Sequence, residues 1–427
     1  MTNTQSDIPE PARGQGTRER RRQASRERLR RRRRLALLAV VVALVAAVAI
    51  ASCGGGSSKS GGAGKGAASS AGGGKPAPVV PGGPLAPASV GGLAALWAPQ
   101  NVVGSQPGTA AAYEAASKKA GLPGYLMIAD RGNNRMLVVD AKGAIVFRYP
   151  TAADLAMGRR LIYDDDTFVE PGGQALISNE EDNHAIVQVT LADRSLRVLF
   201  GHPGESGSDR THMHTPDDAY MLPDGTLTVA DAYNCRILFI KAQAIVRQYG
   251  TTGVCRHDPP RYLGAINGDT PMPGGGMLVS EIAGSWIDTI SSEGKLISAV
   301  KAPVSFPSDP QPLPGGRILL ADYATPGHVL IVNRRGRVLW RYGPAQGPGE
   351  LNHPSLASTL PNGDVAVNDD YNDRVIVIDP RTNRIVWQYG HNSLAGTGPG
   401  YLNTPDGMDF VPAGPRGGPD YAAVVHP

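Results

Sequence analysis

An internal repeat is the feature of this sequence that most restricts its fold. The pattern Asp-x-x-Asn-x-Arg, followed by an alternating run rich in β-branched residues, starts at Asp130, Asp231 and Asp369. Successive acidic positions stand 41 to 51 residues apart, a period typical of chains in which each unit packs on its neighbours. Degenerate copies of the repeat stand in the same register at Glu180, Glu281 and Asp322.

Each unit repeats one order of strand and turn signals. In the third unit the turn Pro223-Asp224-Gly225 precedes a short strand that ends at the acidic residue. Two more strands follow at 236–240 and 244–249, and the segment before the turn supplies a fourth. Four short antiparallel strands without helical periodicity are typical of a propeller blade. The sequence therefore predicts an all-β, six-bladed β-propeller of four-stranded antiparallel blades.

The two ends of the repeat region predict how the propeller closes. The first unit begins near Gly124 and lacks the segment that precedes the turn in the others. After the sixth unit, residues 398–411 repeat the lead-in and then stop without a complete blade. We expect residues 406–411 to supply the missing inner strand of the first blade, which removes an open sheet edge. Residues 420–425 could form one more strand.

The repeats resemble a known family. The Asp-x-x-Asn-x-Arg strands and the lead-in Gly-Pro-Gly-x-Leu-Asn-x-Pro at 398–405 look like NHL repeats, which form six-bladed propellers. The strand endings at 338–343 and 385–390 also resemble pyrroloquinoline-quinone-like and arylsulfate-sulfotransferase-like propellers. These likenesses cover residues 124–412 and imply a fold rather than a function, because such propellers serve as scaffolds for unrelated tasks.

The segment before the repeats carries membrane-targeting features. Residues 1–34 hold twelve arginines against four acidic residues, and residues 35–51 are 17 uncharged apolar residues. This arrangement is typical of a signal peptide or a membrane span whose basic end stays in the cytoplasm. Ile50-Ala51-Ser52-Cys53 resembles a bacterial lipobox. We expect either a lipoprotein lipidated at Cys53 or an uncleaved signal anchor, and both place the propeller outside the cell membrane.

Composition divides the chain into four parts. Residues 1–34 are a basic cytoplasmic tail or signal n-region, and 35–52 are the signal or transmembrane segment. Residues 53–108 consist mainly of Gly, Ser, Ala and Pro, which predicts a disordered, flexible linker. Residues 109–427 are assigned to the propeller, with a helix expected at 109–120. Beyond residue 34 acidic residues outnumber basic ones, 34 to 30, so the pI of 8.9 reflects the tail and nucleic acid is not an expected partner.

The cysteines agree with export. With Cys53 assigned to the anchor, Cys235 and Cys255 remain as a pair in an oxidising compartment. Cys235 stands at the start of the third strand of blade 3, and Cys255 lies a few residues past the end of the fourth. Antiparallel pairing brings these positions to the same edge of the propeller, so we predict a disulfide. Two buried free thiols are the alternative.

Candidate site residues gather on one face of the predicted propeller, where the lead-in loops and the turns after the second strands meet around the channel. Histidines at i and i+2 beside carboxylates could bind a divalent metal or act as base and nucleophile. They could equally line the opening of the channel, with their hydrogen bonds made to loop backbone and water. The candidates are His212, His214, Asp217, Asp218, Asp309, His353 and Asp406, with Asp164, Asp165, Asp166, Asn267, Asp269 and Ser308 at equivalent lead-in positions.

The repeated acids Asp130, Asp231 and Asp369 invite a metal interpretation too, but their recurrence favours a structural role in every blade. We expect them to accept hydrogen bonds from the N–H groups of the tight turn and to pair with the arginine five positions later.

Three functions fit these features. The prediction is a membrane-anchored binding or interaction module for an extracytoplasmic protein or a small molecule, because we find no catalytic triad, P-loop or zincin motif. The alternatives are a sulfotransferase-like enzyme with a channel histidine as nucleophile and Arg210 as a basic partner, and a metal-dependent lyase or lactonase. A divalent metal could serve as cofactor, and pyrroloquinoline quinone is not expected.

Overall fold

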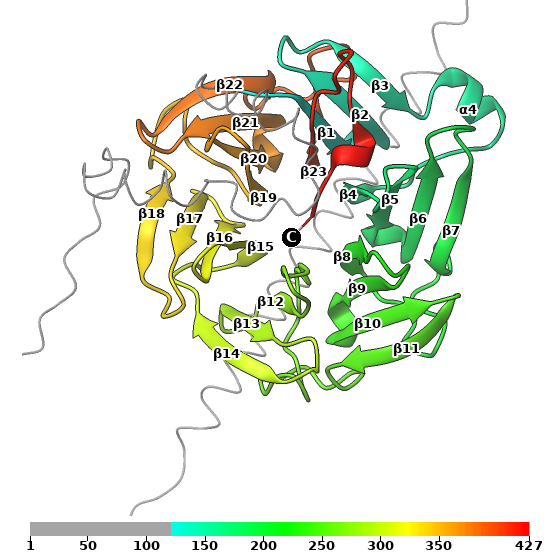
Figure 1. The fold of residues 1–427 in the computed structure, drawn as a ribbon, viewed down its shortest axis with the longest axis vertical. Coiled ribbons are helices and arrows are strands. Elements are labelled where there is room, and N and C mark those ends of the chain that lie inside the picture. The colour runs from blue at the N-terminus through cyan, green and yellow to red at the C-terminus, as the bar shows by residue number, and fades with distance from the viewer. Residues whose placement is uncertain (1–120, 427) are drawn as a thin grey trace, which may run out of the picture. The chain divides into compact units, whose positions relative to one another are not determined.

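The computed structural model describes residues 121–426, and the statements below concern that part of the chain. Six antiparallel sheets surround one central axis, each with one edge toward the centre (Figure 1). The predicted all-β six-bladed propeller is therefore confirmed. The arginine-rich tail, the apolar stretch, Cys53, the linker and the expected helix at 109–120 lie outside the described residues. None of the described helices is both long enough and apolar enough to span a membrane.

The first three blades each have four strands, in the order inner to outer. Blade 1 consists of β23 (Asp406–Val411), β1 (Tyr125–Asp130), β2 (Arg135–Asp140) and β3 (Ile145–Tyr149). Blade 2 consists of β4 (Asp164–Val169), β5 (Ala175–Glu180), β6 (Ala185–Thr190) and β7 (Leu196–Gly201). Blade 3 consists of β8 (Pro216–Met221), β9 (Leu227–Asp231), β10 (Arg236–Lys241) and β11 (Ala244–Tyr249). The short helix α4 (Ala152–Ala156) connects blades 1 and 2.

Blade 4 departs from the predicted four strands. It has β12 (Met277–Glu281), β13 (Trp286–Ile290) and β14 (Leu296–Lys301). Residues 265–271 occupy the position of the innermost strand. They hydrogen-bond to β12 only through isolated bridges, because Pro271 lacks an N–H group and the backbone is irregular around Gly268. Blade 5 consists of β15 (Pro307–Leu313), β16 (Arg317–Asp322), β17 (His328–Val332) and β18 (Val338–Tyr342). Blade 6 consists of β19 (Pro354–Thr359), β20 (Val365–Asp369), β21 (Arg374–Asp379) and β22 (Arg384–Gly390).

A 3-10 turn follows the repeated acid in four blades, and a residue with left-handed backbone ends it. Asn134 and Asp373 take this conformation readily, because Asn and Asp tolerate positive φ better than most residues. The sharp turn sets the second and third strands side by side and leaves its own side chains on the face around the channel. The four turns are η1 (Arg131–Asn133), η2 (Glu181–Asn183), η3 (Ala232–Asn234) and η4 (Asp370–Asn372).

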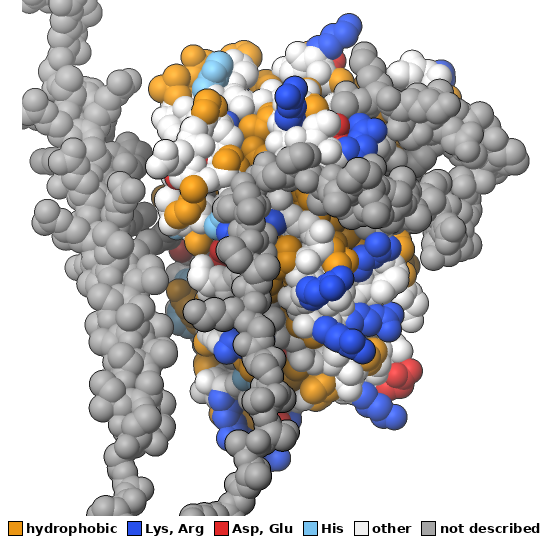
Figure 2. Space-filling model, turned by 90° about the vertical axis from the view of Figure 1, so that its left-hand side faces the viewer, with side chains coloured by type: hydrophobic (Ala, Val, Ile, Leu, Met, Phe, Trp, Pro, Cys, Tyr) orange, Lys and Arg blue, Asp and Glu red, His pale blue; other side chains and the backbone are white. Residues whose placement is uncertain are grey.

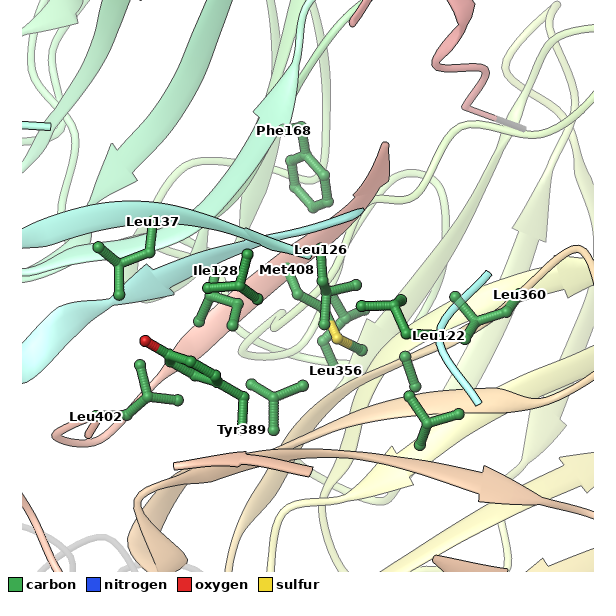
Figure 3. Packing of buried hydrophobic residues seen from close by; sticks show 14 of the residues in the cluster. Leu122, Leu126, Ile128, Leu137, Phe168, Leu356, Leu360, Tyr389, Leu402 and Met408 are labelled. Carbon is green, nitrogen blue, oxygen red and sulfur yellow. The ribbon is translucent and has the colours of Figure 1, made fainter. Parts of the chain in front are cut away.

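The closure predicted from the ends of the repeat is confirmed. β23 pairs antiparallel with β1, with Tyr125 opposite Val411 and Ile128 opposite Met408. Figure 3 shows Met408 among Leu126, Ile128 and side chains of blade 6, so the last strand completes the apolar core shared by the first and sixth blades.

The segment after β23 forms a 3-10 helix, η5 (Tyr421–Ala423), and not the additional strand considered for 420–425. His426 follows it, with Nε2 2.8 Å from Asp409 and its ring against Phe168 and Tyr220. These partners lie on inner strands, toward the ends away from the 3-10 turns, and Figure 1 places the C-terminal end near the centre of the propeller. The tail thus packs against the inner strands of blades 1, 2 and 3.

The Cys235–Cys255 disulfide predicted from strand order is confirmed, with the two Cα atoms 5.2 Å apart. Cys235 occupies the left-handed position after η3, and Cys255 lies in the loop that leads from blade 3 to blade 4. The bridge therefore fastens that loop, residues 251–264, to the third blade.

We expect the double variant Cys235→Ala/Cys255→Ala to lower the free energy of unfolding by about 3 kcal/mol, because the bridge closes a loop with a sequence separation of 20. Urea unfolding of the full-length chain in detergent measures the change. Reductant should weaken the wild-type protein by a similar amount and leave the variant unchanged. Mass mapping of the denatured, unreduced chain that finds both thiols free would contradict the pairing.

Candidate functional site

β-bulges on the inner strands shape the channel. The register of β4 shifts between Asp164 and Thr167, so Asp165 and Asp166 lie together opposite one residue of β5. A bulge leaves an extra residue unpaired and redirects side chains. Equivalent irregularities occur at Asp217 in β8 and at Asp309 in β15, and also in β19 and β23. The bulges explain how neighbouring carboxylates of one strand both turn toward the channel region.

The repeated acids act as clamps within their blades, and the predicted pairing with arginine is confirmed. Asp231 accepts a hydrogen bond from Arg236 Nε at 2.7 Å and others from the side chain of Asn234. Its backbone donor differs from the expected one, because it is the lead-in N–H of His214 and not an N–H of the tight turn. Asp130 and Asp369 repeat this arrangement with Arg135 and Asn403 and with Arg374 and Asn352.

Buried carboxylates from most blades surround the channel. Asp166 and Asp309 are 3 % and 4 % exposed, and one oxygen of each has no hydrogen-bond partner among the described residues. Both oxygens of the fully buried Asp269 are likewise without a partner. Buried charges without partners are costly, which indicates that the channel is built for protons or for a cation. The buried or nearly buried members are Asp165, Asp166, Asp217, Asp218, Asp269, Asp309, Asp370 and Asp406.

Arg131 of η1 supplies positive charge to one side of this group. Its guanidinium contacts Asp165 and Glu181 and lies 2.9 Å from Asp406. Burial opposes the charge of Arg131, but the surrounding carboxylates outweigh it and hold the arginine pKa well above its ordinary value. Arg131 therefore stays charged and balances one side of the carboxylate group.

Asparagine side chains connect several neighbouring blades around the channel. Asn179 Nδ2 donates to Asp165 and to the backbone oxygen of Asp217 at 2.7 Å, which links blades 2 and 3. Asn267 contacts the Asp217 side chain, and its Oδ1 accepts the backbone N–H of Asp309 at 3.1 Å. These bonds fix the bulges in place, so the carboxylates are held rigidly.

Burial raises the pKa of the channel carboxyls. For Asp166, burial and the nearby charges of Asp309 and Asp218 hold the pKa well above its ordinary value. For Asp218 the main cause is again burial, which raises the pKa to about 7 against two backbone hydrogen bonds. The side of the channel around Asp166, Asp218, Asp269 and Asp309 is thus short of positive charge.

The predicted histidines have different surroundings. His212 pairs with Asp209 of its own loop at 2.8 Å and stacks on His202. The ring of His214 contacts His184 and Tyr233. His353 packs against Tyr323 and Tyr371, and its burial lowers the pKa of the imidazole. The aspartates gather in the channel, whereas these three histidines do not form one cluster.

Several of these rings form an aromatic rim beside the carboxylates. Tyr371 belongs to η4, next to the channel residue Asp370, and Tyr323 follows the repeated acid of blade 5. Burial and then the nearby charge of Asp370 raise the pKa of Tyr323 well above its ordinary value, which places this ring near the acidic group. We call Tyr233, Tyr323, Tyr371, His214 and His353 the aromatic rim.

Other surface features lie elsewhere. A cleft of about 460 Å³ between blades 4 and 5 is lined by Ser305, Asp322, His328 and Arg341. Figure 2 shows Lys and Arg side chains on the visible side of the propeller and few acidic ones. Many acidic residues of the described part of the chain are buried, including Asp166, Asp218 and Asp309.

Sequence reasoning missed Arg131, Glu181, Asp370 and Asn179. Three of them share one position, directly after the repeated acid of their blades, and this position holds a different residue type in each blade. Superposing the six repeats and examining the position after the repeated acid would have found Arg131, Glu181 and Asp370. Asn179 directly precedes the repeated acid of blade 2, and Asn368 holds the same position in blade 6.

Comparisons with known proteins show only distant structural likenesses. No family model matches the sequence, and no curated protein matches it. A protein of unknown function from Bacteroides caccae is 18% identical, with 66% of this chain and 97% of that chain covered and a TM-score of 0.45. A streptogramin B lyase structure is 15% identical, covering 69% and 85%, with a TM-score of 0.45. A chain of a nidogen/laminin complex is 13% identical, covering 66% and 97%, with a TM-score of 0.47.

Identities and TM-scores this low carry no argument about this chain. The NHL-like character of the repeats stays a prediction, as does the resemblance to quinone and sulfotransferase propellers.

Proposed function

We propose that this protein is a membrane-anchored extracytoplasmic binding module whose channel holds a divalent cation, with Ca²⁺ as the best fit. The observation that carries the proposal is the set of buried channel carboxylates with unpartnered oxygens, such as those of Asp166 and Asp309. A cation among them would replace the protons that burial otherwise favours.

The chemistry of the donors favours a small, hard ion. Calcium takes six to eight oxygen ligands from carboxylates, amide carbonyls and water. The channel offers carboxylates, and the side-chain oxygens of Asn179 and Asn368 have no hydrogen-bond partner among the described residues. Because Asp166, Asp218 and Asp309 are almost fully buried, the site suits an ion better than a side chain of a partner.

The position of the cation follows from Arg131. Asp165, Glu181 and Asp217 bring ligand oxygens within 4.8 Å of one another, but Asp165 and Glu181 already share the Arg131 guanidinium. A second cation there would be repelled. Burial and then the nearby charge of Asp309 raise the pKa of Asp166, so the cation belongs on the side of these two residues.

The face that a ligand would use is the one with the aromatic rim, because the C-terminal tail packs against the inner strands at the opposite end. Tyr233 is 61% exposed and Tyr371 is 46% exposed. Exposed aromatic rings on a rigid scaffold are common anchors for a protein or small-molecule ligand. A cation held among the buried carboxylates would leave these exposed rings available for contact.

An enzyme that uses the channel-mouth histidines has less support. His212 pairs with Asp209, and His214 and His353 contact different aromatic rings. Nucleophilic or general-base chemistry requires such groups within hydrogen-bond reach of one another and of one reacting atom.

Calcium titration of the full-length chain in detergent, after removal of metals with EDTA, tests the proposal. We expect saturable binding by isothermal titration calorimetry and at least a tenfold loss of affinity in Asp166→Asn and Asp309→Asn, because each variant removes a ligand charge while keeping the side-chain shape. Asp224→Asn is the matched control, since Asp224 is an exposed turn residue paired with Lys241. Absence of binding at millimolar Ca²⁺, or equal affinity in all variants, would refute the cation site.

A further inference from the structure

Blade 4 lacks the acid–arginine clamp that blades 1, 3 and 6 use. Its repeated acid, Glu281, lies opposite Trp286, at the place where blades 1, 3 and 6 have an arginine. The partner of Glu281 Oε2 is the Nδ1 atom of His257, at 3.0 Å. Glu281 is fully buried, and its other oxygen has no hydrogen-bond partner among the described residues.

A second carboxylate lies beside Glu281 where the other blades have an aliphatic side chain. Asp288 pairs with Val279 in the sheet, and the equivalent residue is Leu238 in blade 3 and Ile376 in blade 6. Asp288 is 0% exposed, and neither of its oxygens has a hydrogen-bond partner in the described part of the chain. An acid at a core position of a repeat, next to another acid, is strongly destabilising without a compensating cation.

The loop that carries His257 is held firmly over these acids. Cys255 is bridged to blade 3, and the buried Leu263 packs in the core between blades 3 and 4. The His257 ring stacks on Trp286, with centroids 4.2 Å apart and planes 4° from parallel. Gly264 leaves room for the acid, because a Cβ there would lie 2.8 Å from Glu281 Oε2. The imidazole is thus fixed in place before any ligand binds.

We propose that His257, Glu281 and Asp288 form a second metal site, separate from the channel, that binds Zn²⁺ and ties the 251–264 loop to blade 4. Ligand atoms of the three side chains lie within 4.8 Å of one another, and His257 Nδ1 is 3.9 Å from Asp288 Oδ2. One imidazole nitrogen with two carboxylates suits zinc, which takes such ligands at about 2.0–2.2 Å and leaves a fourth place for water. Calcium prefers an all-oxygen set, so the two sites should select different ions.

The competing arrangement is a proton shared between the two acids. Burial, with the adjacent Glu281 as the second cause, raises the pKa of Asp288 to about 9 in the metal-free protein. A shared proton would satisfy the acids but would give no reason for an imidazole fixed against them. The two arrangements are separated by measuring metal directly.

Zinc titration of the EDTA-treated full-length chain in detergent, against a chromophoric chelator, provides the test. We expect His257→Gln and Asp288→Leu each to bind one Zn²⁺ fewer per chain than the wild type, regardless of how many zinc ions the channel itself binds. Cobalt in place of zinc should give visible d–d absorption in the wild type that both variants lose. Asp288→Leu installs the residue found in blade 3, so this variant should fold even if His257→Gln does not.

His391→Gln serves as the control, because the His391 ring packs on Tyr401 in another part of the propeller. It should keep the full zinc stoichiometry and the cobalt spectrum. Equal zinc stoichiometry in wild type, His257→Gln and Asp288→Leu would overturn the proposal and leave the shared proton as the explanation. Because calcium affinity is measured independently through Asp166 and Asp309, failure of one site does not imply failure of the other.

Discussion

A chain that ends after Pro405 should fail to form a folded monomer. The truncation removes β23, so β1 loses every backbone pair on its inner side and the sheet gains an open edge. It also removes Met408 and Val411, both buried, whose burial contributes about 3–6 kcal/mol of a total stability of about 5–15 kcal/mol. Size-exclusion chromatography and urea unfolding of the detergent-solubilised chain measure the loss.

A chain that ends after Pro419 is the matched control. It keeps β23 and lacks η5 with its partly buried Tyr421, together with the contact of His426 to Asp409. We expect this shorter truncation to unfold cooperatively at a somewhat lower urea concentration. If the chain ending after Pro405 were equally cooperative, closure by β23 would not be needed for the fold.

In EDTA, the free energy of unfolding should fall as pH rises from 5 to 8. The folded-state pKa of Asp218 is raised to about 7, above the value of about 4 expected in the unfolded chain, so the native state binds more protons across this range. The stability linked to Asp218 is full below pH 4 and is lost as pH rises toward 7, on the order of 4 kcal/mol in all. Urea unfolding at several pH values, with and without Ca²⁺, measures this dependence.

Asp218→Asn should have a flatter pH profile in EDTA than the wild type, because it cannot ionise. Saturating Ca²⁺ should reduce the loss in the wild type, since a cation stabilises the ionised carboxylates that high pH produces. His184 and His353 have lowered pKa values and act in the opposite direction, so the difference between wild type and Asp218→Asn is the informative quantity. An identical profile for the two proteins would contradict the assignment.

The sequence was enough to predict the fold because the evidence for it is periodic. The recurrence of the acid at Asp130, Asp231 and Asp369, with degenerate copies at Glu180, Glu281 and Asp322, gave the number of blades, and the truncated repeat at 398–411 gave the closure. Local strand order placed Cys235 beside Cys255. Blade 4 was harder, because residues 265–271 carry no strand pattern and pair with β12 only through isolated bridges.

The site was predicted in part. Lead-in positions such as Asp309 and Asp406 were placed near the channel from blade geometry alone. The sequence could not show that bulges turn both Asp165 and Asp166 inward, because a bulge depends on the pairing of the strand with its neighbour. It also could not reveal Asp288 as unusual until the sheet register aligned it with Leu238.

The pairing of β1 with β23 has a consequence for the order of folding. β1 ends at Asp130 and its inner partner begins at Asp406, so this contact spans most of the propeller's length, and contacts between such distant residues form slowly. During synthesis the other five blades can assemble from neighbouring segments, while the inner edge of β1 stays unpaired until β23 has been made. Asp406 and Asp409 belong to this last strand, β23. The group of channel carboxylates is therefore completed in the same step that closes the propeller.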